Sequence, residues 1–532
     1  MSEKGLYFNA SGKITEKVKD EDIPKPLFSD NNNYLDTYNY AVSIMKKNII
    51  HPNPKSGFIS SMIKTAFNNN IFLWDTSFIT IYSHMFGSTI PGIESLDNFY
   101  IKQFKNGEIC REIDETTGED FSMWKNKFNK ILYSYYHYSY KFRAANKNLK
   151  ILYENTYKPM LGRDVTEIPN LTLDAINNPM LALAEWKNYE YSGDVERLFL
   201  VIRPLYEYIM VYYRLLRHKS NLYITDWASM DNSPRNKFLG LAVDTSSQVV
   251  LNAKIIKRMN EIVDEKIKKK ILKKHEINLL NNIIEKTSDA INKYMWDPET
   301  NFYYDVDFEF NKSNIKTAAC FWTIISGVAD KFKLDRLIEH ITNKNEFWML
   351  HKIPSLSADE VGYESLGGYW KGGVWSPIEF MITEGLKMQN HYDLAKTIAV
   401  NHVDIVSKVF EKTATILEYY PPDKISSGEN DKFDFVGWSG LGPIRFLIEY
   451  YLGIEAKGYE DKIIWNINQD LKYSGCYDFQ YKGAKVDLFA KKTSHGYRIK
   501  VKSSIDLKLE ITLDDKIEFN IKKNEIFESL IW

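Results

Sequence analysis

The feature that most constrains the fold of this chain is a long succession of helical segments joined in pairs by short polar turns. One pair begins at Asn178-Pro179, a helix cap followed by proline, and reverses direction at residues 192–194. Another begins at Ser376-Pro377 and reverses at residues 389–393, with apolar side chains three and four positions apart. About a dozen such helices follow one another between residues 34 and 455. Consecutive hairpins in this number predict an all-α fold, a closed ring of helical hairpins.

Two shorter segments flank the predicted ring. Residues 1–33 are polar and irregular, which indicates a lead-in that packs against another part of the protein. After Ala456 apolar and polar residues alternate, as in residues 497–501, and this spacing is typical of β-strands. We therefore expect an N-terminal lead-in at 1–33, a helical domain at 34–455 and a small C-terminal β domain at 456–532.

The charge balance gives no reason to expect a nucleic acid or an anionic membrane as a partner. Lysine and arginine number 69 against 70 aspartates and glutamates. No apolar run is long enough to cross a bilayer, and the N-terminus lacks the apolar core of a signal peptide. The three cysteines, Cys110, Cys320 and Cys476, are odd in number and far apart, which favours reduced thiols. We expect a soluble cytoplasmic protein, and its oligomeric state stays open.

No nucleotide-binding or metal-binding motif stands out in the sequence, so it predicts no cofactor and no metal ion. His402 lies on the apolar stripe of a predicted helix and is interpreted as a core histidine rather than a ligand. A neutral or locally recognised substrate fits this composition best.

Carboxylates, tryptophans and glycines gather in four loop-like segments at helix ends: residues 73–76, 227–235, 367–375 and 417–422. A ring of hairpins brings alternate loops to one mouth, so these segments are able to line one pocket. Aromatic residues make up 14% of the chain, and several of its 12 tryptophans lie in such loops rather than on apolar faces. Sugar-binding clefts use aromatic side chains in this way, so a carbohydrate substrate is favoured.

Two carboxylates in these segments suit glycosidic bond hydrolysis, which needs one carboxylic acid to protonate the leaving oxygen and a second carboxylate to activate water or attack. Asp231 lies in a polar stretch between two helical segments, although Asp-Asn-Ser-Pro is also good turn chemistry. Glu418 could be a solvated residue at a helix end, but Tyr419, Tyr420 and the prolines after them surround it with apolar bulk. Asp231 and Glu418 are therefore the candidate pair.

Three motifs carry a resemblance to a known group of enzymes: residues 229–235, 368–375 and 434–441. They resemble the helical-toroid glycosidases, which comprise the processing α-glucosidases of glycoside hydrolase family 63, the mannosylglycerate and glucosylglycerate hydrolases and, more distantly, the family 37 trehalases. The resemblance spans roughly residues 68–454. It implies that the helical domain is a catalytic (α/α)6 toroid. It also implies that this domain cleaves a terminal α-linked glucose or mannose from an oligosaccharide or small glycoside, with inversion.

The resemblance also implies roles for individual residues. Asp231 would be the general acid and Glu418 the base that activates water, at roughly 6.5–9.5 Å from each other as inversion requires. Trp74 and Asp75 would hold the terminal sugar. The pocket would be lined by Trp227, Arg235, Lys371, Gly372, Trp375 and Trp438.

Several alternatives remain open. Many relatives have arginine where Lys371 stands, and the trehalase signatures near the carboxylates are not reproduced, which counts against trehalose. A glucosylglycerate or mannosylglycerate hydrolase or a trehalase is the first alternative. A sugar epimerase or lyase is the second, because helical toroids host those reactions too, but none of the ten histidines lies in the four segments. A non-catalytic carbohydrate-binding protein is the third, and it would not need both Asp231 and Glu418.

Overall fold

The structure is a computed structural model of the 532-residue chain. It describes residues 4–15, 18–65, 69–119, 178–223, 230, 232–237, 240–430, 432–513 and 515–531. Within these ranges, no helix is long and apolar enough to span a membrane.

The described helices form antiparallel pairs, as the sequence predicts. The main helices are α1 (Asn32–Lys47), α2 (Leu73–Ser83), α9 (Leu181–Ser192), α10 (Val195–Val211), α11 (Val243–Ile267), α12 (Lys274–Ala290), α13 (Trp322–Ile325), α14 (Lys331–Ile341), α15 (Ser376–Met388) and α16 (Tyr392–Thr413). Gly193 ends α9 at a φ of 71°, and Asp194 caps α10 by accepting from the Arg197 amide. Pro377 stands in the first turn of α15, where its missing N–H costs nothing.

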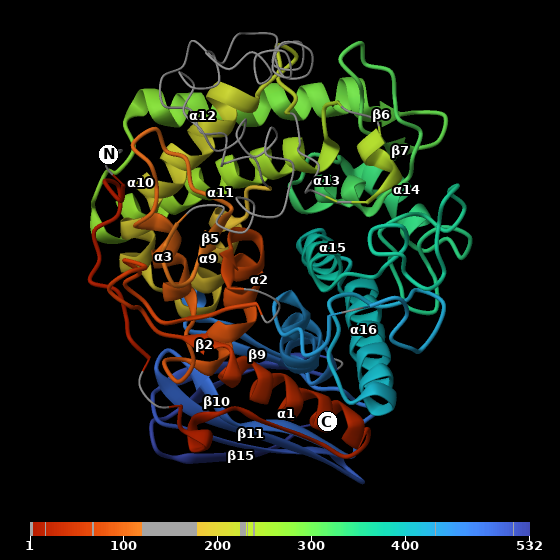
Figure 1. The fold of residues 1–532 in the computed structure, drawn as a ribbon. Coiled ribbons are helices and arrows are strands. Elements are labelled where there is room, and N and C mark those ends of the chain that lie inside the picture. The colour runs from red at the N-terminus through yellow and green to blue at the C-terminus, as the bar shows by residue number, and fades with distance from the viewer. Residues whose placement is uncertain are drawn as a thin grey trace.

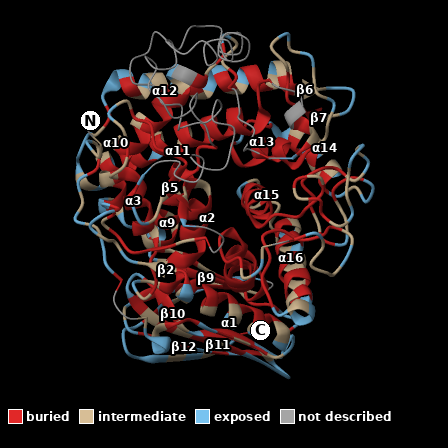
Figure 2. Cartoon of the chain, viewed as in Figure 1, coloured by how far each residue is buried: buried red, intermediate tan, exposed pale blue. Residues whose placement is uncertain are grey.

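Contacts between helices close a ring. They run from α2 to α9, α11, α13 and α15, and return to α2 through the short helix η11 (Trp438–Leu441). Figure 1 shows these helices around the centre of the view, with α10, α12, α14, α16 and α1 toward the periphery. Buried residues follow the inner helices, while exposed ones gather on the outer loops (Figure 2). The helical part of the chain therefore has the arrangement of a toroid.

A two-sheet β region follows the last helix η12 (Gly442–Tyr451), so the chain as a whole is not all-α. Its strands are β8 (Ile454–Lys457), β9 (Lys462–Asn466), β10 (Tyr473–Tyr481), β11 (Ala484–Thr493), β12 (Gly496–Ser503), β13 (Leu507–Thr512), β14 (Lys516–Ile521) and β15 (Ile526–Ile531). In β12 Tyr497, Ile499 and Val501 are buried and the residues between them exposed. The alternation expected there is confirmed.

The N-terminal lead-in joins this β region. Strand β1 (Lys25–Phe28) pairs antiparallel with β10, and the five-stranded sheet has the order β1-β10-β11-β12-β15. The second sheet has the order β14-β13-β9-β8. In Figure 1 β10, β11 and β15 form a layer beneath α1.

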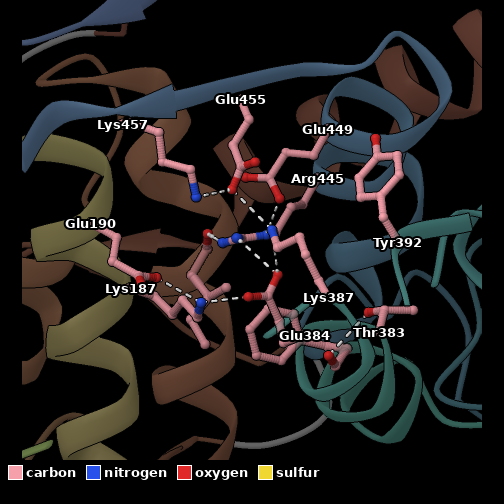
Figure 3. Close-up of polar contacts among 12 residues, drawn as sticks. Lys187, Glu190, Thr383, Glu384, Lys387, Tyr392, Arg445, Glu449, Glu455 and Lys457 are labelled. Atoms are coloured by element: carbon pink, nitrogen blue, oxygen red, sulfur yellow. Dashed lines mark hydrogen bonds and ion pairs between the residues drawn. The ribbon is translucent and has the colours of Figure 1, made fainter. Parts of the chain in front are cut away.

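A buried network of charges connects the ring to the β region (Figure 3). Glu384 on α15 is fully buried and contacts Lys187 on α9, Lys387 at 3.3 Å and Arg445 at 3.5 Å. Lys387 also binds Glu455 on β8 at 2.9 Å. Burial alone would raise the pKa of Glu384, but the three cations hold that pKa well below its ordinary value. The network thus fixes α9, α15, η12 and β8 to one another.

Candidate active site

Two of the polar segments lie side by side because their backbones pair. Val374 donates to the Tyr420 carbonyl at 2.8 Å, and Tyr420 donates to the Val374 carbonyl at 3.0 Å. This short antiparallel bridge brings residues 367–375, just before α15, against residues 417–422, just after α16. Segments about 45 positions apart in the chain therefore share one wall.

Glu418 lies in this wall with its carboxylate almost fully buried at 2% exposure. Lys432 Nζ donates to Glu418 Oε1 at 2.8 Å. Trp438 Nε1 donates to the Glu418 carbonyl at 2.9 Å, and Ser439 Oγ donates to the Leu417 carbonyl at 2.7 Å. Both the side chain and the backbone of Glu418 are thus fixed by neighbours.

The carboxyl group of Asp75 is close enough to Glu418 to interact with its charge, although Asp75 belongs to α2, far earlier in the chain. It lies in the first turn of α2 and is 5% exposed. Burial, then the charge of Glu418, raises the pKa of Asp75 well above its ordinary value. Among the residues that the structure describes, its Oδ1 atom has no hydrogen-bond partner. Such an acceptor is one that a bound hydroxyl group would satisfy.

Helix α2 is attached directly to the segment around Trp438. Tyr82 Oη donates to the Gly437 carbonyl at 2.7 Å, and its ring packs against Gly440 so closely that a Cβ there would lie 2.5 Å from the ring. Trp74, one turn before Phe78, is half-buried and packs edge-on against Phe78 and Trp322. Helix α2, which begins with the first predicted segment, therefore lies beside the motif at residues 434–441.

Aromatic side chains from three segments stack beside Glu418. Trp375 stacks on Trp370 with ring centres 4.0 Å apart and planes at 6°, and on Tyr419 with centres 5.1 Å apart and planes at 22°. Trp438 lies 5.7 Å from Trp375. A Cβ at Gly373 would lie 2.7 Å from the Tyr419 ring, so only glycine allows this packing. Within the described chain, the Trp375 Nε1–H is buried without an acceptor.

The segment that contains the candidate acid is described only in part. Asp231 and Trp227 lie outside the described residues. The neighbouring Asn232 donates from Nδ2 to the Gly368 carbonyl at 2.9 Å and accepts at Oδ1 from the Trp370 amide at 2.8 Å. Asn232 therefore joins the described part of this segment to the wall formed by residues 367–375.

Arg235 anchors the same segment from beneath. Its guanidinium makes paired hydrogen bonds of 2.7–2.9 Å to Asp244 and Asp305, and it is 3% exposed. Burial works against its charge, but the two carboxylates raise its pKa above the ordinary value. These contacts give Arg235 a positioning role, whereas the sequence suggested that it lines the pocket. Asp244 and Asp305 were not singled out from sequence because neither lies in a loop motif.

A cavity of about 420 Å³ opens between these segments. It is lined by Asn232, Glu364, Gly368, Tyr369, Lys371, Tyr419, Glu429 and Lys432. Of the predicted pocket residues that the structure describes, only Lys371 belongs to this lining, and it pairs with Glu364 at 2.9 Å. Gly372, at a φ of 144°, shapes the turn beneath Lys371, because a Cβ there would lie 2.8 Å from the Glu364 carbonyl. Trp375 stacks on Tyr419 of this lining, Trp438 packs against Trp375, and Glu418 pairs with Lys432 of the lining. Trp74 and Asp75 are not among the lining residues.

Comparisons with known proteins point to a shared group. Residues 217–444, less than half of the chain, match the model of the family described as Trehalase. An uncharacterized protein of Borreliella burgdorferi is 25% identical over 342 residues, which cover 62% of this chain and 70% of that protein.

Solved structures share the fold at low identity. The GH63 mannosylglycerate hydrolase of Thermus thermophilus, in complex with glucose, has a TM-score of 0.55 at 15% identity and covers 77% of this chain and 99% of its own. A GH78 family rhamnosidase of Bacillus sp. GL1 has a TM-score of 0.59 at 12% identity, covering 96% of this chain and 44% of its own. The expected resemblance to the GH63 and trehalase-type helical glycosidases is confirmed.

Proposed function

We propose that this chain is a glycoside hydrolase of the trehalase and GH63 type. It removes a terminal α-linked glucose or mannose from an oligosaccharide or small glycoside with inversion, and its helices form the (α/α)6 barrel of such enzymes. Asp231 protonates the leaving oxygen, and Glu418 activates the water that attacks from the opposite face of the sugar. The match of residues 217–444 supports this proposal, because it contains both carboxylates.

The contact that carries the proposal is the ion pair between Lys432 and Glu418. A general base must be ionised before it can take a proton from water. A cation at 2.8 Å favours the charged form of a carboxyl that is otherwise buried. The Trp438 and Ser439 hydrogen bonds fix the backbone on either side of the carboxylate, which keeps its oxygen directed at one water position.

The neighbours of Asp231 support its role as the acid. Asn232 fastens the loop to Gly368 and Trp370, and Arg235 fastens it to Asp244 and Asp305. A chain that is fixed directly after Asp231 would restrict the positions that a proton donor there can take.

The remaining walls suit a sugar ring. The buried Oδ1 of Asp75 accepts from a hydroxyl of the terminal sugar, and the half-buried Trp74 offers an aromatic surface. Trp375, which is stacked on Trp370 and Tyr419, offers its indole N–H, and Trp438 packs against Trp375. Lys371 and the turn at Gly372 border the part that holds the leaving group. A cavity of about 420 Å³ lies in the lower range of ligand pockets, roughly 300–1,000 Å³, which suits a small glycoside.

A second candidate is a hydrolase for a sugar that is linked to a small carboxylic acid, such as mannosylglycerate. The ammonium groups of Lys371 and Lys432 both border the cavity and would pair with a substrate carboxylate. The mannosylglycerate hydrolase of Thermus thermophilus, with its similar fold, makes this candidate worth a direct test.

The test is a time-resolved proton NMR assay on a panel of α-glucosides and α-mannosides that includes trehalose, glucosylglycerate and mannosylglycerate. The wild type should release the β-anomer of the sugar first, and Asp231→Asn and Glu418→Gln should each lose turnover. Glu411→Gln, which changes an exposed carboxylate near the end of α16, is the control and should stay active. Release of the α-anomer first, or full activity of Asp231→Asn, would refute the mechanism.

A further inference from the structure

Three side chains with strong metal-binding groups meet behind the Glu418 wall. His351 lies between α14 and α15, Glu379 lies on α15 and His402 on α16, and all three are fully buried. One ligand atom from each lies within 4.8 Å of the others. His351 also donates its backbone N–H to the Pro422 carbonyl at 2.8 Å. The cluster therefore adjoins residues 417–422, the segment that contains Glu418.

The hydrogen bonds of the cluster join its two histidines but do not include the Glu379 carboxyl group, among the residues that the structure describes. His351 Nε2 and His402 Nδ1 are 2.8 Å apart, and His402 Nε2 lies 3.0 Å from Ser376 Oγ. Within the described part of the chain, neither oxygen of Glu379 nor the Nδ1 atom of His351 has a hydrogen-bond partner. A fully buried carboxyl without a partner is costly, so its presence calls for a ligand that satisfies it.

The electrostatics of the cluster match the chemistry of a bound cation. Burial, then the neighbouring His402, lowers the pKa of His351 well below its usual value. Burial lowers the pKa of His402 to about 3. A neutral imidazole offers a nitrogen lone pair to a metal ion. Burial raises the pKa of Glu379 well above its usual value, and Lys352 only partly offsets this. A divalent cation at this point would stabilise the carboxylate.

We propose that His351, Glu379 and His402 form a structural site for a divalent transition metal, with Zn²⁺ as the ion that the two imidazoles and one carboxylate suit best. A water molecule completes a tetrahedral set. His402 Nε2–H donates to Ser376 Oγ, so Nδ1 carries the lone pair of this ring, and on metal binding Nδ1 exchanges its hydrogen bond with His351 Nε2 for the ion. Each imidazole keeps one N–H and Glu379 gives up its proton, so one proton is released for each ion bound.

The position of the site implies a structural role. None of its three residues lines the cavity, whereas α15 begins directly after Trp375 and the Tyr420 ring lies 5.8 Å from the His351 ring. An ion here joins α15 to α16 and supports the backbone on both sides of the Val374–Tyr420 bridge. No sequence pattern indicated this site, because the ligands are separated by 28 and 23 positions without a recognisable motif.

The experiment is metal analysis of the whole protein, expressed in zinc-supplemented medium and purified without a histidine tag or chelator. The wild type should hold about one equivalent of Zn²⁺, and its thermal midpoint should fall on chelation and recover when Zn²⁺ is restored. Substitution by Co²⁺ should give the intense visible bands of a tetrahedral site. Calorimetric Zn²⁺ titrations in buffers of different ionisation enthalpy should report release of one proton.

Matched variants locate the site. Glu379→Gln and His402→Gln should bind Zn²⁺ at least about tenfold more weakly and lose the cobalt bands. His84→Gln is the control, because His84 is also buried and stacked on Tyr191, but it is surrounded by cations rather than a carboxylate. Less than about 0.1 equivalent of metal in the wild type, without cobalt bands or a thermal response, would overturn the proposal. The wild-type cobalt spectrum decides the matter even where a variant fails to fold.

Discussion

Replacing Lys432 by methionine removes the cation 2.8 Å from Glu418 Oε1 while keeping a side chain of similar length. An exposed ion pair is worth about 0–1 kcal/mol, whereas removing one partner of a buried pair costs about 3–5 kcal/mol. The Glu418 side chain is 2% exposed and that of Lys432 27% exposed, so solvent screens the pair in part. We therefore expect the free energy of unfolding to fall by about 2–3 kcal/mol. We also expect kcat/KM to fall near neutral pH, because a base that loses its cation is less fully ionised.

The pH dependence of kcat/KM identifies the cause of this loss. Without the cation the ionised form of the base is less favoured, so the acidic limb of the profile should move to higher pH and activity should recover partly under alkaline conditions. Lys371→Met is the matched control, because Lys371 also lines the cavity but pairs with the more exposed Glu364. It should raise KM and leave the acidic limb in place.

Either of two results would refute this reasoning. Unchanged kcat/KM in Lys432→Met would mean that the ion pair does not support the base. An equal loss at every pH would mean that Lys432 binds the substrate instead. The substrate found in the NMR panel is the one to use, over a pH range in which all three proteins remain folded.

Three further changes have defined outcomes. Asp75→Asn replaces a carboxyl oxygen that would accept from a sugar hydroxyl by an amide nitrogen that can only donate, and it should lower kcat/KM about 10–100-fold. Burial and Glu418 raise the pKa of Asp75, so the wild type loses stability as pH rises above about 4, whereas the variant does not titrate there. The thermal midpoint of the variant relative to the wild type should therefore rise with pH, and a constant difference would contradict this. Glu384→Gln should lower the free energy of unfolding in urea by about 3–5 kcal/mol. Because the pKa of Glu384 is depressed, the wild type loses this stability at low pH, and the difference in unfolding free energy between wild type and variant should narrow as pH falls. Equal stability of the two proteins at pH 7 would contradict this prediction. Gly373→Ala places a Cβ 2.4 Å from the Tyr369 carbonyl and should reduce both the thermal midpoint and turnover. A variant with the thermal midpoint and turnover of the wild type would show that residues 367–375 can move to accommodate the methyl group.

The helical part of the fold was largely predictable, because helix boundaries depend on local chemistry. The turn at residues 192–194 and the start of α15 at Ser376-Pro377 follow from capping and proline geometry, which the sequence displays directly. The pairing of β1 with β10 was not predictable, since strand pairing depends on contacts between distant segments. The sequence indicated only that the lead-in packs against some other part of the chain.

The candidate site was predictable in its segments but not in its contacts. Loops rich in tryptophan and glycine marked the right regions, and the structure joins residues 367–375 to 417–422 through the Val374–Tyr420 bridge. Lys432 was overlooked because it follows a charged stretch that resembles an ordinary surface loop. The partners of Arg235 were overlooked because ion pairs buried between helices leave no local pattern.

The pairing of β1 with β10 sets an order of events during synthesis. Lys25 in β1 binds Asp478 in β10, which is 453 residues further along the chain. At about 5–20 residues per second, a ribosome needs about 20–90 s to make that stretch. For all of that time β1 has no partner strand, and the sheet that unites the two ends of the protein is among the last parts to assemble. A chaperone or a fused tag that occupies residues 25–28 during this interval would delay the final step of folding while the helices form normally.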